Sequence, residues 1–196
     1  MMARHVANCM IKDEGRVVFC SNCGAKLKMK IPEEDNRVRG VCDECNTIHY
    51  ENPKIIVGSV TTYKNRILLC RRAIEPKFGF WTLPAGYMEL NESTSEGAMR
   101  ETVEESGANI TLKRLFAIHD LPFLNQVHIF FLAEMNNSKL NPGSETLEAR
   151  LFAVNEIPWS ELAFKTVGKT LDFFIKKDRY NKDHVYTSVF SLGKKS

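Results

Sequence analysis

The sequence predicts an α+β fold with a mixed β-sheet, preceded by a small zinc ribbon. Strand-like and helix-like segments interleave along the chain without a regular βαβ repeat, so a purely parallel sheet is not expected. A well-capped helix follows a glycine-opened loop near the middle of the chain. Two Cys-x2-Cys pairs stand before these segments, at a spacing typical of zinc ribbons.

The elements follow one another in a simple order. Short β-hairpins are expected over 18–50, and a turn at 51–53 leads into the first strand of the larger domain. The two-residue turn Lys64-Asn65 returns the chain as the second strand of a hairpin. A loop and a helix come next, then three strands and a final helix. The expected ranges are 54–63, 66–73, 93–107, 110–119, 126–134, 147–154 and 160–177.

The two cysteine pairs are Cys20-x2-Cys23 and Cys42-x2-Cys45. Each pair can occupy a tight turn and present two thiolates to one tetrahedral ion. Two disulfides are the alternative, but the sequence shows no secretory signal peptide, which favours intracellular zinc. Because protein fills all four positions, the zinc is expected to be structural. Cys70, within an apolar segment, is interpreted as a buried strand residue.

The central helix carries both its start and stop signals. Ser93 followed by Glu96 forms a capping box, and Gly107 is a natural end. The expected buried stripe consists of Ala98, Met99, Thr102 and Val103.

Three glutamates, Glu101, Glu104 and Glu105, stand at i, i+3 and i+4 on this helix, so they share one face. Like charges arranged in this way repel one another, and a divalent cation removes the repulsion. Carboxylate oxygens suit Mg²⁺ or Mn²⁺ rather than zinc. The sequence therefore predicts a catalytic Mg²⁺ or Mn²⁺ site on the helix.

The spacing G-x5-E-x7-R-E-x2-E-E-x-G resembles the Nudix box of hydrolases that act on nucleoside diphosphate derivatives. It is formed by Gly86, Glu92, Arg100, Glu101, Glu104, Glu105 and Gly107. Thr102 and Ala108 depart from the family, which more often has Ile, Leu or Val there. The resemblance implies an α/β/α sandwich, with Glu101 and Glu105 as main metal ligands, Glu104 nearby and the carbonyl of Ala85 completing the shell. It assigns Gly86, Glu92, Arg100 and Gly107 to the structure of the loop and helix.

Blocks such as FCSNCG, HYENPKIIVG and ILLCRRAIEP resemble zinc-ribbon Nudix enzymes that include plant chloroplast FAD pyrophosphatases. Resemblance to the related zinc-ribbon NADH pyrophosphatases implies that Glu145 is a last metal-binding glutamate, with Glu148 as the alternative, and that Tyr87 stacks on a base. Glu145 is expected on a mobile loop, where it joins the metal cluster or acts as general base. Glu101 and Glu104 are the competing bases. Arg72 is a candidate for binding phosphate and Phe80 for lining the base pocket.

The resemblance favours a pyrophosphatase that converts FAD to FMN and AMP. ADP-ribose, giving AMP and ribose 5-phosphate, is the first alternative. NADH is disfavoured, because the region after the box reads FAIHDLPFLNQ and lacks the stretch typical of NADH pyrophosphatases. An enzyme acting on RNA caps uses the same chemistry. A non-catalytic nucleotide-binding regulatory domain usually loses box carboxylates, and this chain keeps them.

Composition limits the partners of this protein. The formal net charge is only +3, and no basic stripe suggests a nucleic-acid partner. No apolar run is long enough to span a membrane. We expect a small-molecule nucleotide substrate and, from zinc-ribbon relatives, a homodimer. The expected domains are a leader (1–17), the ribbon (18–50), the hydrolase domain (51–183) and a tail (184–196). The cytoplasm is the expected compartment, with a mitochondrion or plastid as the alternative.

Overall fold

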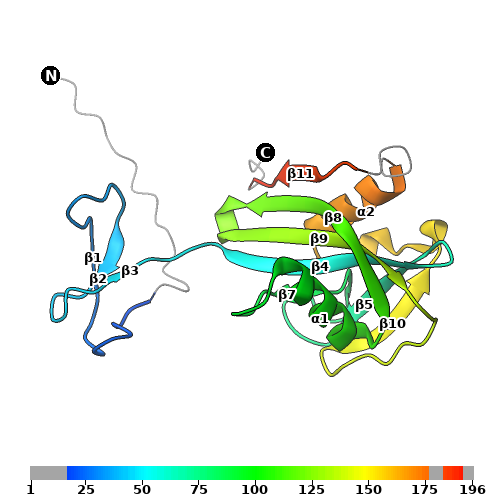
Figure 1. Ribbon diagram of the computed structural model, residues 1–196, viewed down its shortest axis with the longest axis horizontal. Coiled ribbons are helices and arrows are strands. Elements are labelled where there is room, and N and C mark those ends of the chain that lie inside the picture. Colours follow the sequence, from blue (N-terminus) through cyan, green and yellow to red (C-terminus); the bar gives the residue numbers. More distant parts are fainter. Residues whose placement is uncertain (1–16, 177–182, 192–196) are drawn as a thin grey trace, which may run out of the picture. The chain divides into compact units, whose positions relative to one another are not determined.

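The computed structural model describes residues 17–176 and 183–191 (Figure 1). The chain divides into two compact units, one up to Asn52 and one from Pro53 onward, and the division falls in the turn expected at 51–53. Apart from Val17, the expected leader lies outside the described residues. In the described part of the chain, no helix has both the length and the apolar character needed to cross a membrane.

The first unit is a three-stranded antiparallel sheet with the order β1-β2-β3. Its strands are short: β1 is Lys28–Lys30, β2 is Arg39–Val41 and β3 is Ile48–His49. The small core contains Cys20, Leu27 and Cys42. A core of this size needs a further cross-link to be stable, because so few side chains leave water.

The second unit is built on an eight-stranded mixed sheet. The main path runs β10-β5-β4-β9-β8-β11, with β6 on β5 and β7 on β4. The β4–β9 and β8–β11 pairs are parallel, and the remaining pairs are antiparallel. The strands are β4 Lys54–Tyr63, β5 Arg66–Arg72, β6 Trp81–Thr82, β7 Ala85–Tyr87, β8 Ile110–Leu121, β9 Gln126–Met135, β10 Thr146–Phe152 and β11 Tyr186–Val189.

Two helices cover opposite faces of this sheet. They are α1 (Thr94–Ser106) and α2 (Lys165–Lys176). Successive residues of β9 show the division: Phe130 packs in the cluster that contains Leu171 of α2, and Phe131 packs with Ala98 of α1. Because adjacent strand residues point to opposite faces, the helices lie on either side. The layers are α/β/α, which confirms the predicted fold class. Within the described residues, the unit also has three 3-10 turns, at Pro122–Leu124, Val154–Glu156 and Trp159–Glu161.

Local signals placed the hairpin and α1 correctly. Lys64 and Asn65 both have positive φ, 46° and 63°, as a two-residue hairpin turn requires. Ser93 and Glu96 form the capping box from both sides. Gly107 ends the helix in the left-handed conformation, with φ of 65°.

The buried face of α1 differs from the prediction. Met99 and Val103 are 40% and 45% exposed, so their assignment to the buried stripe was wrong. Ala98 and Thr102 are buried as predicted, and the other buried residues are Gly97 and Ser106. Two residues of β4 face this side of the helix: Val57 packs with Ala98, and the hydroxyl of Ser59 lies 2.7 Å from that of Thr102.

Two further boundaries differ from expectation. The last helix begins at Lys165 rather than 160, because a 3-10 turn and an extended segment precede it; residue 177 lies outside the described residues. Tyr186–Val189, which the sequence analysis assigned to the tail, forms β11 and pairs with β8. Tyr186 is buried in the core against Phe116 and Phe173.

Candidate active site

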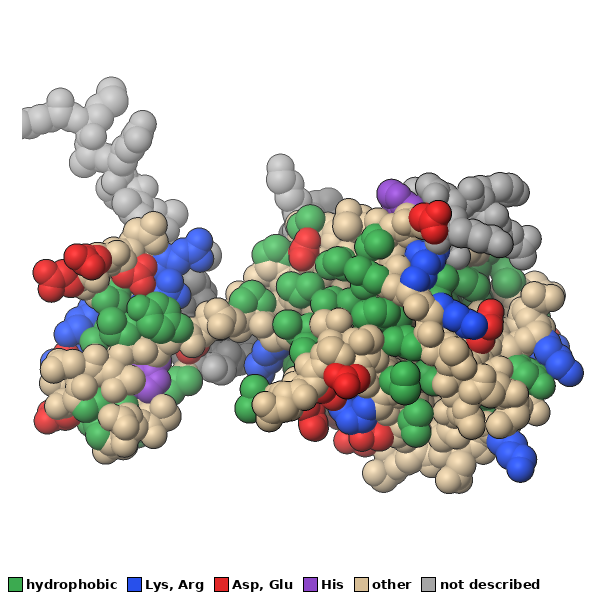
Figure 2. Space-filling model, viewed as in Figure 1, with side chains coloured by type: hydrophobic (Ala, Val, Ile, Leu, Met, Phe, Trp, Pro, Cys, Tyr) green, Lys and Arg blue, Asp and Glu red, His purple; other side chains and the backbone are tan. Residues whose placement is uncertain are grey.

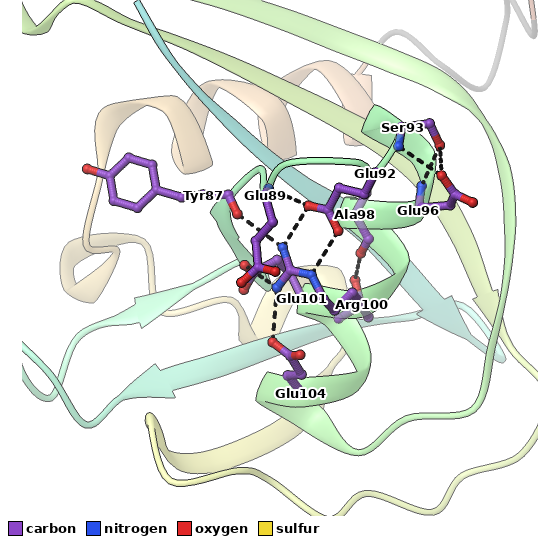
Figure 3. A network of polar contacts seen from close by, with 10 residues as sticks. Tyr87, Glu89, Glu92, Ser93, Glu96, Ala98, Arg100, Glu101 and Glu104 are labelled. Atoms are coloured by element: carbon purple, nitrogen blue, oxygen red, sulfur yellow. Dashed lines mark hydrogen bonds and ion pairs between the residues drawn. The ribbon is translucent and has the colours of Figure 1, made fainter. Parts of the chain in front are cut away.

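Arg100 fastens the loop before α1 to the helix (Figure 3). Its Nε and Nη2 each donate to one carboxylate oxygen of Glu92 at 2.9 Å, and Nη2 also donates to the carbonyl of Tyr87 at 3.0 Å. Two parallel bonds of this kind are the strongest form of arginine–carboxylate pairing. They hold the pKa of Glu92 at about 2, so this carboxylate stays charged and bonded.

Gly86 allows the carboxylate of Glu101 to lie directly against the loop. A Cβ at position 86 would lie 2.3 Å from both carboxylate oxygens of Glu101. The carboxylate also accepts a bond of 2.8 Å from Nη1 of Arg100, and its side chain is only 13% exposed. The loop and the arginine together therefore fix where Glu101 points.

The three helix glutamates and Glu145 line one cavity of about 410 Å³. Glu104 is the outermost of the three helix glutamates, with 59% of its side chain exposed, and accepts a bond from Arg100. Glu105 lies deeper and accepts a bond of 3.3 Å from the backbone N–H of Ala85. On the surface, acidic side chains gather around a basic one over α1 (Figure 2). The structure thus brings Glu101, Glu104, Glu105 and Glu145 together, with Ala85 beside them.

Burial shapes the electrostatics of this cavity. Burial raises the pKa of Glu105 to about 8, and the charge of Glu101 adds to the effect. Burial also raises the pKa of Glu101, although the bond from Arg100 opposes the shift. Desolvated, mutually repelling carboxylates are stabilised as anions when a cation joins them. The donor set, all oxygen, fits Mg²⁺ or Mn²⁺.

The glutamate oxygens are less tightly gathered than the ribbon sulfurs. Within the described ranges, the ribbon cysteines are the set of possible ligands whose atoms all lie within 4.8 Å of one another. Arg100 draws Glu101 and Glu104 toward itself, and like charges keep the remaining oxygens apart. The identity of the individual metal ligands therefore stays a prediction.

Three residues of the cavity wall were missed by the sequence analysis: Glu89, Gly143 and Ser144. Glu89 lies two residues after β7, and its backbone N–H donates to Glu92 at 2.7 Å. Its position between two residues of the box could have marked it. Gly143 and Ser144 reach the cavity only through the folding of the segment before β10, and no local spacing indicates this.

The three predicted substrate-binding residues lie outside the wall of this cavity as the described residues form it. The ring of Tyr87 points away from the carboxylates (Figure 3) and has the ammonium of Lys54 5.4 Å from its centre. Arg72 donates to the carbonyl of Pro76, and its guanidinium lies 5.2 Å from the centre of the Phe164 ring. Its charge still lowers the pKa of Glu105. Phe80 lies under the ammonium of Lys77. Substrate contacts by these residues stay predictions.

The second site is the cysteine cluster of the first unit. All four cysteines, Cys20, Cys23, Cys42 and Cys45, are free thiols. The Cys20–Cys45 and Cys23–Cys42 sulfurs are 3.5 and 3.4 Å apart. Sulfurs bound tetrahedrally at about 2.3 Å from zinc would be about 3.8 Å apart. The cluster therefore fits one four-coordinate zinc ion, as predicted, and leaves no ligand position open.

Neighbouring polar groups lie beside two of these sulfurs. Nε2 of His49 lies 3.4 Å from the sulfur of Cys20, and Oγ1 of Thr47 lies 3.1 Å from that of Cys45. The bonds from Thr47 lower the pKa of Cys45 to about 5, which favours the thiolate that binds metal. Cys70, by contrast, is buried in β5, and burial raises its pKa, as expected of an inert core thiol.

Two family models match the chain in tandem. The model described as "Nudix N-terminal" matches residues 18–51, and the model of the NUDIX domain matches residues 53–174, more than half of the chain. The chain belongs to the Nudix family. The resemblance drawn from the box is confirmed, and so is the zinc-ribbon Nudix architecture.

Two relatives of this Nudix chain are named for different activities. The NAD-capped RNA hydrolase NudC of Vibrio parahaemolyticus is 32% identical over 143 residues, which cover 71% of this chain and 52% of the relative. An ADP-ribose pyrophosphatase of Methanocaldococcus jannaschii is 30% identical over 119 residues, covering 59% of this chain and 69% of the relative. The chain thus spans about half the length of the NudC relatives it matches.

Solved structures support the Nudix fold. A NUDIX hydrolase from Nitrosomonas europaea has a TM-score of 0.83 and 41% identity, and the match covers 89% of this chain and 100% of that one. An ADP-ribose pyrophosphatase from Streptococcus suis has a TM-score of 0.58 and 22% identity, covering 70% of this chain and 100% of that one, and shows the common fold alone.

Proposed function

We propose that this Nudix protein is a divalent-metal-dependent pyrophosphatase that hydrolyses the diphosphate of a small adenosine-containing molecule. The observation that carries the proposal is the cavity in which Glu101, Glu104 and Glu105 meet Glu145. A diphosphate anion would be repelled by these carboxylates alone, so the cavity suits it only together with cations.

Different residues of the cavity would have different roles in this reaction. Glu101 and Glu105, with Glu145 and the carbonyl of Ala85, would hold the cations. When bound, divalent cations would neutralise the diphosphate and lower the pKa of a bound water. Gly86 and Arg100 keep Glu101 in place, because one leaves room for its carboxylate and the other bonds to it.

Hydrolysis needs one proton acceptor in this cavity. The acceptor takes a proton from the attacking water, the water oxygen bonds to phosphorus, the bridging P–O bond breaks, and two monophosphates leave. Glu145 is the first candidate for this base. Glu101 and Glu104 each use a carboxylate oxygen to accept a hydrogen bond from Arg100, whereas no such bond reaches the Glu145 carboxylate within the described chain.

FAD is our first candidate substrate, with FMN and AMP as products. It rests on the sequence blocks that resemble the FAD pyrophosphatases. ADP-ribose is the second candidate, supported by the relative named for that activity. The NudC relatives support NAD-capped RNA as a third candidate. A diphosphate attached to adenosine is common to FAD, ADP-ribose and NAD, so the proposed chemistry is the same for each.

The wider predictions are kept as proposals. We propose one structural zinc in the ribbon, a homodimer and a cytoplasmic protein, with domain boundaries at 18–50 and 51–183. The ribbon model beginning at residue 18 and the NUDIX model beginning at residue 53 support the two-domain division. Light scattering of the full chain tests the homodimer, since a molecular mass of one chain would contradict it.

A substrate panel tests the proposed function. Purified full-length chain would be incubated with FAD, ADP-ribose, NADH or NAD-capped RNA, in Mg²⁺ or Mn²⁺, and products would be separated by chromatography. Matched samples with excess EDTA report the metal requirement. We expect kcat/KM to be highest for FAD or ADP-ribose. A tenfold preference for NADH or capped RNA would overturn the substrate ranking, and no cleavage of any substrate would overturn the proposed function.

A further inference from the structure

The segment between β9 and β10 is held against the end of α1. The backbone N–H of Asn141 donates to the carbonyl of Ser106 at 2.8 Å. Gly107 lies so close that a Cβ there would meet the carbonyl oxygen of Asn141 at 2.3 Å. The sequence analysis expected Glu145 on a mobile loop, and in the structure these contacts join the segment before it to the helix that carries the glutamates.

Gly143 also lies against the backbone of the glutamate helix. A Cβ at position 143 would lie 2.4 Å from the carbonyl oxygen of Glu104. Real Cβ atoms essentially never come within 3.0 Å of such an atom, so any side chain must push the segment away by about 0.6 Å or more. The atom it would meet belongs to the helix backbone, which cannot rotate away as the end of a side chain could. The φ of Gly143 is outside the left-handed region, so alanine there suffers from this contact and not from its own conformation.

Glu145 follows Gly143 by two residues and is tied on its other side. The N–H of Thr146 donates to the carbonyl of Gly143 at 3.1 Å, which closes a turn around Ser144 and Glu145. The carbonyl of Glu145 accepts from the N–H of Ala73 at 2.8 Å, at the edge of the sheet. The backbone of Glu145 is therefore held on both sides, by its hydrogen bond at the sheet edge and by the contact of Gly143 with α1.

We propose that Gly143 is a positioning residue that sets the place of Glu145 relative to the glutamates of α1. The inference rests on the proposed function. It explains why a glycine occupies the wall of the cavity beside Glu145. A misplacement of about 1 Å at a reacting group can cost on the order of 10²-fold in rate, so the displacement forced by alanine is large enough to matter.

The test compares Gly143→Ala with a matched glycine far from such contacts. Gly168→Ala in α2 is the control, because a Cβ there meets nothing closer than the Cδ1 of Leu162 at 3.7 Å. On the best substrate of the panel, we expect Gly143→Ala to lower kcat by about 10- to 10²-fold with KM changed less than threefold. Gly168→Ala should match the wild type. Thermal unfolding of each variant shows whether the fold is retained.

A double-mutant cycle separates action through Glu145 from general damage. If Gly143 acts through Glu145, Gly143→Ala should add less than about twofold to the loss already caused by Glu145→Gln. Multiplicative losses would mean that alanine acts by displacing Glu104 or the helix, and would overturn the inference. So would a Gly143→Ala protein with normal kcat.

A measurement without turnover keeps this inference apart from the proposed function. Mn²⁺ affinity would be measured by calorimetric titration of the wild type, Gly143→Ala, Glu145→Gln and the double variant. We expect about tenfold weaker binding in Gly143→Ala and little further loss in the double variant, as found for residues that orient metal ligands. If the wild type cleaves no substrate, the proposed function fails, and unchanged Mn²⁺ affinity in Gly143→Ala then overturns the inference as well.

Discussion

Replacing Thr102 with valine is expected to destabilise the Nudix unit (residues 53–196) without changing its shape. Thr102 lies on the buried face of α1, where the family more often has an aliphatic residue. Its hydroxyl donates to the carbonyl of Ala98 at 2.7 Å and lies 2.7 Å from the hydroxyl of Ser59. Ser59 in turn lies 2.6 Å from the hydroxyl of Thr61, and all three side chains are fully buried.

The direction of these bonds follows from the donor count. Thr102 uses its only proton on Ala98, so Ser59 must donate to Thr102 and Thr61 must donate to Ser59. Valine keeps the volume of threonine but offers no acceptor, which leaves a buried hydroxyl proton without its partner. An unsatisfied buried donor costs about 1–3 kcal/mol. For a domain of this size, that corresponds to a fall in Tm of roughly 3–10 °C.

Urea unfolding of the full chain, followed by tryptophan fluorescence, measures the free energy of unfolding. The reference is the triple variant Ser59→Ala, Thr61→Val, Thr102→Val, in which every hydroxyl of the chain of bonds is gone. Removing both partners of a buried bond is nearly neutral, so the triple variant should recover at least half of the loss. The reasoning is refuted if Thr102→Val is within about 0.3 kcal/mol of the wild type, or if the triple variant is less stable than the single one.

Three more predictions follow from other parts of the molecule. Gly86→Ala should lower kcat at least tenfold with little change in Tm, because the new Cβ displaces the side-chain carboxylate of Glu101 and no backbone; an unchanged kcat would contradict this. Elemental analysis should find about one zinc per chain, and clearly less in Cys20→Ser; a zinc-free wild type would refute the ribbon assignment. His119→Asn should reduce the loss of stability between about pH 6.5 and 4, measured by urea unfolding at several pH values. Burial lowers the pKa of His119 to about 4, so the unfolded chain binds the proton first and stability, complete above pH 6.5, falls with pH; His128, shifted likewise, should keep part of the slope. An unchanged slope in the variant would show that His119 is not responsible.

The helix α1 was predictable because its signals are local. Ser93, Glu96 and Gly107 act on backbone groups within one turn of themselves, so their pattern identifies the helix without knowledge of the fold. The predicted buried stripe also included Met99 and Val103. That part was wrong because the burial of a helix residue depends on which side chains the sheet presents to it. The hydroxyl of Ser59 comes from a strand far away in the chain, and no helical periodicity reveals it.

The sequence patterns could not predict elements that are very short or that depend on contacts with distant parts of the chain. β6 and β7 contain two and three residues, too few to show alternation, and β11 joins the sheet only by parallel pairing with β8. The helix glutamates were found because their spacing follows the helical repeat. Gly143 and Ser144 reach the cavity because the segment before β10 turns back onto α1, which only the tertiary structure shows.

The most direct test of the central claim is the turnover of Glu105→Gln on the best substrate of the panel. Glu105 lies deep in the cavity, and the change removes one negative charge with almost no change in shape. If Glu105 holds the cation in the transition state as proposed, losing its charge should lower kcat by at least about 10²-fold. The exposed Glu161, changed to glutamine, is the matched control and should behave as the wild type. We predict this loss in a Glu105→Gln protein that unfolds no more readily than the wild type. Near-normal turnover in such a protein would contradict the assignment of this cavity as the active site.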